Sequence, residues 1–208
     1  MNYTIMKGKI LCFALFVLSA RVLSQSDGVW DVYNFGAKGD GKTNDVYAIQ
    51  SAIDSCFISG GGKVLLHNGQ FLSGTIRLKS NVTLFIESGT VLLGSDKPND
   101  YPVLKTDYPA VSGEYSTDKA LVYAENAENI AIKGNGTIDG RGDDLELMSR
   151  PRPHIIVFRL CNNIKVRDIK LYNAAFWVQK YQSCNNLLID GITVNSRENK
   201  DIEKLAIF

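Results

Sequence analysis

The sequence has no strong excess of either charge, because its 23 Lys and Arg residues nearly balance its 22 Asp and Glu residues. Nucleic-acid-binding proteins usually carry a clustered basic surface, and this chain has no Lys/Arg run longer than two residues. Binding of DNA or RNA is therefore not expected.

Histidine is scarce too: His67 and His154 are the only two, and neither has a carboxylate or a second histidine at metal-ligand spacing. We expect neither a metal nor another cofactor.

Long apolar runs are also lacking, apart from ILCFALFVLSA between Ile10 and Ala20. This run follows Lys7 and Lys9 and precedes small and polar residues, which is the arrangement of a secretory signal peptide. Its length is about half of what a membrane-spanning helix needs. A buried helix or a membrane anchor is the alternative. We expect residues 1–25 to be a signal peptide, the mature protein to be secreted or periplasmic, and no membrane association after signal removal.

Cysteine is rare as well, since the chain has four and Cys12 would leave with the signal peptide. The remaining Cys56, Cys161 and Cys184 cannot all pair, and they match no zinc-binding spacing. Buried thiols are the simplest interpretation. A disulfide between Cys161 and Cys184 is the alternative in an exported chain.

What the sequence does contain is an internal repeat, with CNNIKVRDIKLYN beginning at Cys161 and CNNLLIDGITVNS beginning 23 residues later at Cys184. The segments NVTLFIESGTVLLG from Asn81 and NIAIKGNGTIDG from Asn129 show the same succession of Asn, alternating apolar residues and a bend. No helical period separates the short strands, and the LxxLxL pattern of leucine-rich repeats is absent. One unit cannot bury its apolar side alone, but stacked units can. The pattern predicts an all-β fold, a right-handed single-stranded parallel β-helix (a solenoid).

One amphipathic helix is expected at the start of this solenoid. Thr43, Asn44 and Asp45 offer capping side chains, and the glycines at 60–62 would end the helix. An apolar stripe at helical spacing lies between them, formed by Ala48, Ile49, Ala52, Ile53 and Cys56. Because a solenoid's first coil exposes an apolar cross-section, the helix should act as an N-terminal cap. Residues 95–119 and 141–153 are expected to be excursions from the coils.

Several segments carry a family resemblance: FGAKGDGKTND (35–45), FLSGTIRLKSNVTLFIESGTVLLGS (71–95), GNGTIDGRG (134–142), PRPHIIVF (151–158) and NAAFWVQKYQSCNN (173–186). Together they resemble glycoside hydrolase family 28, the polygalacturonase-like enzymes, over about residues 29–199. The first three are shared with other solenoids of the pectin-lyase type, and the last two are more specific. The resemblance implies inverting hydrolysis of α-1,4-galacturonosidic bonds, with an acidic plant polysaccharide (pectin or oligogalacturonate) as the partner.

Inverting hydrolysis needs one carboxylic acid and one carboxylate base. The family supplies them from an Asn-Asp or Asn-Thr-Asp segment near residue 200, a following Asp pair, a Gly-His-Gly turn and an Arg-Ile-Lys segment. After Ser196 this chain reads RENKDIEKLAIF and contains none of these motifs. We therefore expect a signal peptide at 1–25, a partial β-helix at 28–199 and a non-matching tail at 200–208. On this interpretation the chain is truncated before its catalytic aspartates and inactive as given, so no catalytic residue is assigned.

Trp177 and Gln179 are the candidate substrate-binding residues, because the repeat places them one coil before the expected carboxylates. An aromatic ring can stack on a sugar, and an amide can bond its hydroxyls; packing of Trp177 inside the coil with Phe176 is the alternative. Arg150 and Arg152 could pair with a substrate carboxylate.

A non-catalytic carbohydrate-binding solenoid remains an alternative function, and a polysaccharide lyase is a less favoured one.

Overall fold

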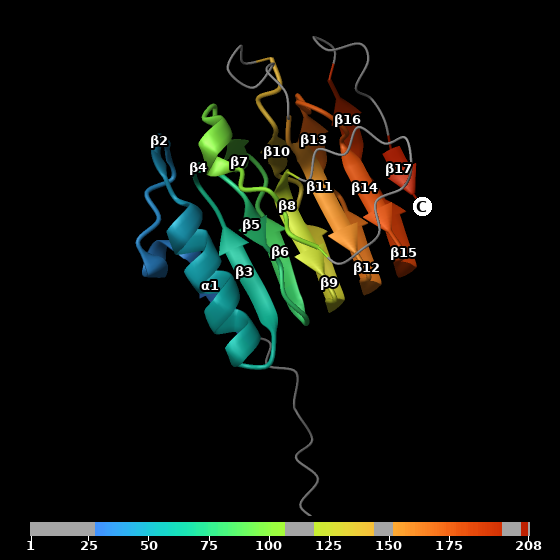
Figure 1. Ribbon diagram of the computed structural model, residues 1–208. Coiled ribbons are helices and arrows are strands. Elements are labelled where there is room, and N and C mark those ends of the chain that lie inside the picture. Colours follow the sequence, from blue (N-terminus) through green and yellow to red (C-terminus); the bar gives the residue numbers. More distant parts are fainter. Residues whose placement is uncertain (1–27, 107–118, 144–151, 197–204, 208) are drawn as a thin grey trace, which may run out of the picture.

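The computed structural model describes residues 28–106, 119–143, 152–196 and 205–207, and Figure 1 shows them as strands stacked side by side along one axis. The chain winds repeatedly through three parallel sheets, so that successive coils contribute one strand to each sheet. This is the right-handed parallel β-helix that the repeat predicts.

The first coil contributes a strand to sheets A and B, and each later coil adds one strand to all three sheets, in chain order. Sheet A consists of β1 (Val29–Asp31), β3 (Gly62–Leu66), β6 (Val82–Ile86), β9 (Glu128–Lys133), β12 (Asn162–Arg167) and β15 (Asn185–Asp190). Sheet B consists of β2 (Asp40–Asn44), β4 (Gln70–Ser73), β7 (Val91–Gly94), β10 (Thr137–Asp139), β13 (Lys170–Tyr172) and β16 (Thr193–Asn195). Sheet C consists of β5 (Ile76–Arg77), β8 (Ala120–Glu125), β11 (His154–Arg159), β14 (Gln179–Gln182) and β17 (Leu205–Ile207).

The strand register confirms the sequence repeat residue by residue. Asn162 pairs with Asn185, and Ile164 lies between Ile130 and Leu187 on the neighbouring strands. Alternate residues of each strand point inward, so equivalent apolar side chains of successive coils form continuous rows in the core. Burial of these rows supplies the main stabilisation of the fold.

Helix α1 (Val46–Ile58) caps the first coil, as predicted, and it is the blue-green helix beside β3 in Figure 1. Its buried positions are Ile49, Ala52, Ile53 and Cys56, and Ala48 is partly buried against the same core. Of the three expected capping side chains, Asn44 accepts the amide of Val46, the first helical residue, at 3.1 Å. Asp45 occupies the N-cap position but makes no capping bond; instead its carboxylate accepts hydrogen bonds from the amides of Lys38 (2.7 Å) and Gly39 (2.9 Å).

Asparagines with positive φ stand at the start of several sheet A strands. Asn81, Asn129, Asn163 and Asn186 all have positive φ values between 52° and 64°, a region that Asn tolerates better than most residues. Asn81 and Asn135 also head the glycosylation-type triplets Asn81-Val82-Thr83 and Asn135-Gly136-Thr137, and Asn135 has a φ of 63°. Their place at coil bends gives both residues a structural role.

The predicted segments outside the coils are only partly described. Residues 95–106 leave the coil stack after β7 and contain the short 3-10 helix η2 (Pro98–Asp100). A separate 3-10 helix, η1 (Val32–Phe35), lies in the first coil. Residues 107–118, 144–151 and the expected signal peptide at 1–25 lie outside the described residues. Of the expected tail at 200–208, residues 205–207 are described, and they form β17, which pairs in parallel with β14. The edge of β14 offers unpaired backbone groups that such a strand can use.

All three cysteines of the described residues are free thiols. Cys56 lies on the buried face of α1, and burial raises its pKa to about 11. Cys161 and Cys184 lie on adjacent coils, where the amide of Asn185 donates to the carbonyl of Cys161 at 2.9 Å. Cys56 and Cys161 are thus buried free thiols, whereas Cys184 is a partly buried one. Cys161 and Cys184 also have the stacking on which the disulfide alternative depended.

Candidate functional site

The outer side of sheet C carries two rows of polar and aromatic side chains. In the first row, Arg77, Tyr123, Val157 and Lys180 are aligned by the strand register. In the second row, Glu125, Arg159 and Gln182 are aligned, and Nε of Arg159 donates to Oε1 of Gln182 at 2.7 Å. Strand alternation produces both rows, because the residues between them belong to the core.

The excursion after β7 covers part of this surface. Leu104 packs against Tyr123 and Val157 in a small apolar cluster, and the Thr106 hydroxyl donates to Oε1 of Glu125 at 2.6 Å. The Tyr123 hydroxyl donates to the other oxygen of the same carboxylate. Burial and then the adjacent Glu125 raise the pKa of Tyr123 to about 12, so its phenol stays protonated at neutral pH. Glu125 is the only carboxylate on the described strands of sheet C.

Trp177 lies in an aromatic and cationic cluster at the end of these rows. Its ring stacks on Phe176 with a centroid distance of 5.4 Å and an interplanar angle of 10°, and His154 approaches it edge-on at 5.6 Å. Nζ of Lys180 lies 5.5 Å from the Trp177 ring centroid, and the Arg152 guanidinium lies 5.6 Å from that of Phe176. Both rings are half-buried. A sugar face could therefore stack on Trp177 with two cations nearby.

Gln179 lies on the opposite side of β14 from Lys180. Its Cα partner is Ile156 of the core, its side chain is 1% exposed, and its Oε1 accepts a hydrogen bond from the buried Tyr181 hydroxyl at 2.5 Å. The two sequence-predicted residues are thus two positions apart in the chain, but Gln179 is buried in the core whereas Trp177 is half-buried. This placement favours Trp177 over Gln179 for a saccharide contact, which remains a prediction.

The other residues of this surface come from separate parts of the chain. Arg152 joins the Trp177 cluster through Phe176, whereas Arg150 lies outside the described residues. Sequence reasoning missed Lys180, Arg159 and Gln182. Strand alternation could have identified all three, because each is next to a core residue, Phe158 or Tyr181, and therefore points outward.

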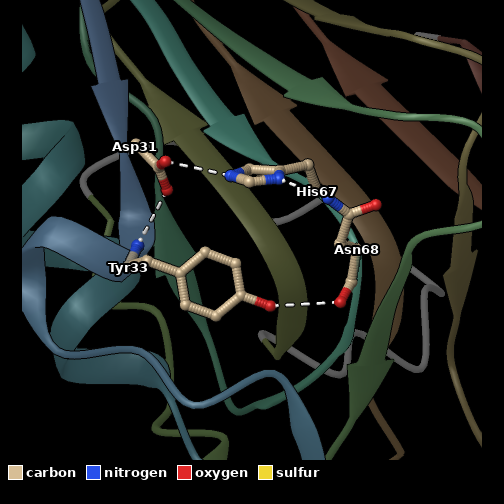
Figure 2. A network of polar contacts seen from close by, with 4 residues as sticks. All are labelled: Asp31, Tyr33, His67 and Asn68. Atoms are coloured by element: carbon tan, nitrogen blue, oxygen red, sulfur yellow. Dashed lines mark hydrogen bonds and ion pairs between the residues drawn. The ribbon is translucent and has the colours of Figure 1, made fainter.

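A second polar cluster lies at the N-terminal end of the solenoid, and Figure 2 shows its four residues. Nε2 of His67 is 2.9 Å from Oδ2 of Asp31, whose other oxygen accepts the Tyr33 amide at 3.0 Å. Nδ2 of Asn68 lies 3.0 Å from Nδ1 of His67, and the Tyr33 hydroxyl donates to the Asn68 carbonyl at 3.2 Å. Burial, followed by Asp31 and Asp45, raises the pKa of Tyr33. The sequence could not reveal this pair, because 36 residues separate Asp31 from His67.

These four residues contain no Ser, Cys or Thr that an Asp–His pair could activate as a nucleophile. The contacts instead tie η1 to the turn between β3 and β4, and Asp31 acts as the N-cap of η1. The cluster is therefore structural, and it stabilises the first coil.

Substitution Asp31→Ala should lower the free energy of unfolding by about 1–2 kcal/mol, because η1 loses its cap and His67 its partner. Urea denaturation followed by circular dichroism measures the change. Asn68→Gly is the matched control: it tolerates the positive φ of 53° and keeps the carbonyl that Tyr33 uses. Equal losses in both variants would contradict the role given to Asp31.

Within the part of the chain that the structure describes, no three His, Cys, Asp or Glu side chains gather in a way that could hold a metal ion. The same residues include no helix whose length and apolarity would suit a membrane crossing.

Comparisons with known proteins agree with the geometry. The model of the family described as "Glycosyl hydrolases family 28" matches residues 64–202. A Vitis vinifera protein named "Probable polygalacturonase" is 30% identical over 205 residues, which cover 90% of this chain and 40% of the relative. The exo-poly-alpha-D-galacturonosidase of Dickeya chrysanthemi is 39% identical over 120 residues, covering 55% of this chain and 20% of the relative.

The solved structure of a family 28 exopolygalacturonase from Yersinia enterocolitica superimposes with a TM-score of 0.69 at 25% identity, covering 81% of this chain and 39% of that one. The chain thus spans less than half the length of each of these three proteins.

Proposed function

This chain belongs to family 28 of the glycosyl hydrolases, and on that premise we propose that it serves the hydrolysis of polygalacturonate. The bond cleaved would be the α-1,4-galacturonosidic link, with inversion, as the family resemblance implies. The proposal includes export from the cell, which rests on the sequence of residues 1–25. Relatives named as polygalacturonases support the substrate class.

The observation that carries the proposal is the cluster around Trp177 on the outer side of sheet C. A galacturonate unit has an apolar ring face and a carboxylate, and this cluster offers a half-buried indole with Arg152 and Lys180 nearby. Lys180 is only 2% exposed, so its role is to hold the indole in place through the cation–π contact. Trp177 and Arg152 are then the side chains that meet the saccharide.

The described strands of sheet C do not themselves hold the pair of carboxylates that inversion requires. Such a pair lies about 6.5–9.5 Å apart, with water between. Glu125 is the one carboxylate on these strands, and hydrogen bonds from Tyr123 and Thr106 occupy both of its oxygens. This favours a second candidate for the 208-residue chain by itself, namely saccharide binding without hydrolysis.

Titration calorimetry with trigalacturonate, combined with a reducing-sugar assay, tests both candidates. We expect binding by the 208-residue chain without release of reducing ends. Trp177→Ala should weaken this binding by about three- to tenfold, because one stacking contact is worth about 0.5–1.5 kcal/mol, and Trp177→Phe should weaken it less. Release of reducing ends would overturn the binding-only candidate, and an unchanged affinity in Trp177→Ala would overturn the assignment of this surface.

A further inference from the structure

A polar hollow lies on the outer side of sheet A, away from the surface described above. Its volume is about 340 Å³, at the lower end of the range of about 300–1,000 Å³ that small-molecule sites occupy. The strand register explains why it forms. Thr83, Ala131 and Lys165 stand side by side on β6, β9 and β12, and the small methyl group of Ala131 leaves space between two larger neighbours.

One wall of the hollow is a chain of hydrogen-bonded asparagine side chains. Nδ2 of Asn129 donates to Oδ1 of Asn81 at 2.9 Å, and Nδ2 of Asn163 donates to Oδ1 of Asn129 at 2.6 Å. Since every bond runs in the same direction, a donor is left over at Asn81 and an acceptor at Asn163. Neither of these two atoms has a hydrogen-bond partner among residues 28–106, 119–143 and 152–196. Both line the hollow together with the Thr83 hydroxyl.

The other side of the hollow is positively charged. Lys133 follows Ala131 by two residues on β9 and therefore points outward beside it, and Lys165 is exposed on β12. The nearby Arg167 is neutralised by Asp190, with 2.9 Å between Nη2 and Oδ2. Lys133 and Lys165 have no carboxylate partner in the described part of the chain, so two cations at the hollow remain available to an anion.

We propose that this hollow on sheet A binds an acidic saccharide, as a second site separate from the Trp177 surface. Paired lysines suit a uronate carboxylate, and the asparagine amides and the Thr83 hydroxyl suit the sugar hydroxyls beside it. The choice of a uronate takes its ligand class from the proposed function, since that function brings polygalacturonate to this protein. The two sites lie on different sheets, so one long polysaccharide could be held at both.

Trigalacturonate titrated into variants of the full 208-residue chain tests the second site. Ala131→Leu fills the hollow, and the double variant Lys133→Gln/Lys165→Gln removes its charge. Each should abolish one of two binding events or weaken it by about tenfold, and added salt should weaken the same event in the unmodified chain. Lys170→Gln, an equally exposed lysine on sheet B, should leave both events unchanged. Thermal unfolding curves confirm that each variant is folded.

The variants separate this inference from the proposed function. If Ala131→Leu and the lysine pair bind as well as the unmodified chain while Trp177→Ala does not, the hollow is not a saccharide site and the Trp177 surface stands. If binding is lost in the hollow variants and kept in Trp177→Ala, the hollow stands and the Trp177 surface falls. Absence of binding in the unmodified chain would overturn both. Neutral trigalactose should not occupy the hollow, and its equal binding there would overturn the role of the two lysines.

Discussion

Substitution Phe158→Ala should lower the free energy of unfolding by about 3–5 kcal/mol, which is the usual cost of removing a buried aromatic ring. Phe158 is fully buried on β11, and its ring lies edge-to-face with Tyr181 on β14 at a centroid distance of 5.8 Å. Its neighbour on β8 is Ala124, whose methyl group cannot fill the vacated space. A domain is stable by only about 5–15 kcal/mol, so the variant should lose a large share of its stability.

Urea denaturation followed by far-ultraviolet circular dichroism measures this loss. Phe158→Leu keeps much of the apolar volume and should cost less than half as much. A loss below about 1 kcal/mol in Phe158→Ala would show that the ring is not enclosed between successive coils. It would then contradict the inward row of sheet C on which the placement of Gln179 and Lys180 also depends.

Substitution Asp45→Ala should have a comparable effect, a loss of about 3–5 kcal/mol. Asp45 is 2% exposed, and each carboxylate oxygen accepts one backbone amide, from Lys38 and from Gly39. Hydrogen bonds to charged groups contribute about 1.5–3 kcal/mol each. Removal of the carboxylate leaves both amides without an acceptor beside the first turn of α1.

Asp40→Ala is the matched control for this experiment. Asp40 also accepts two backbone amides, those of Lys42 and Thr43, but it is exposed and water can replace it. We expect a much smaller loss there than at Asp45. Asp45→Asn, which keeps an acceptor, should fall between the two alanine variants. Equal losses at positions 40 and 45 would contradict the burial-based explanation.

The sequence was sufficient to predict the fold, because the repeat carries the strand register directly. Asn162 and Asn185 are equivalent in the sequence pattern and paired in the structure, as are Leu171 and Val194. The capping helix was likewise readable from its apolar stripe. In a solenoid each contact joins a residue to its equivalent one coil away, so a one-dimensional pattern contains most of the three-dimensional one.

The candidate site was harder to predict, since alternation applies only within a strand. Trp177 and Gln179 are two residues apart, but the chain bends between β13 and β14, and β14 begins at Gln179. Inward and outward positions therefore cannot be counted across Trp177. Asp45 illustrates a different limit: its residue type suits a helix cap, and only the folded path of residues 38–39 shows which amides it binds.

The order of the strands has a consequence for how the molecule acquires its structure. Each described strand pairs only with strands of the coil immediately before or after it, and none of these pairings skips a coil. Once two coils have formed a nucleus, each further coil can dock on a ready template, so growth should propagate like a zipper without a long search for distant partners. The helix-covered end is the natural place for this nucleation, because α1 already contacts β1, β3 and β5 there.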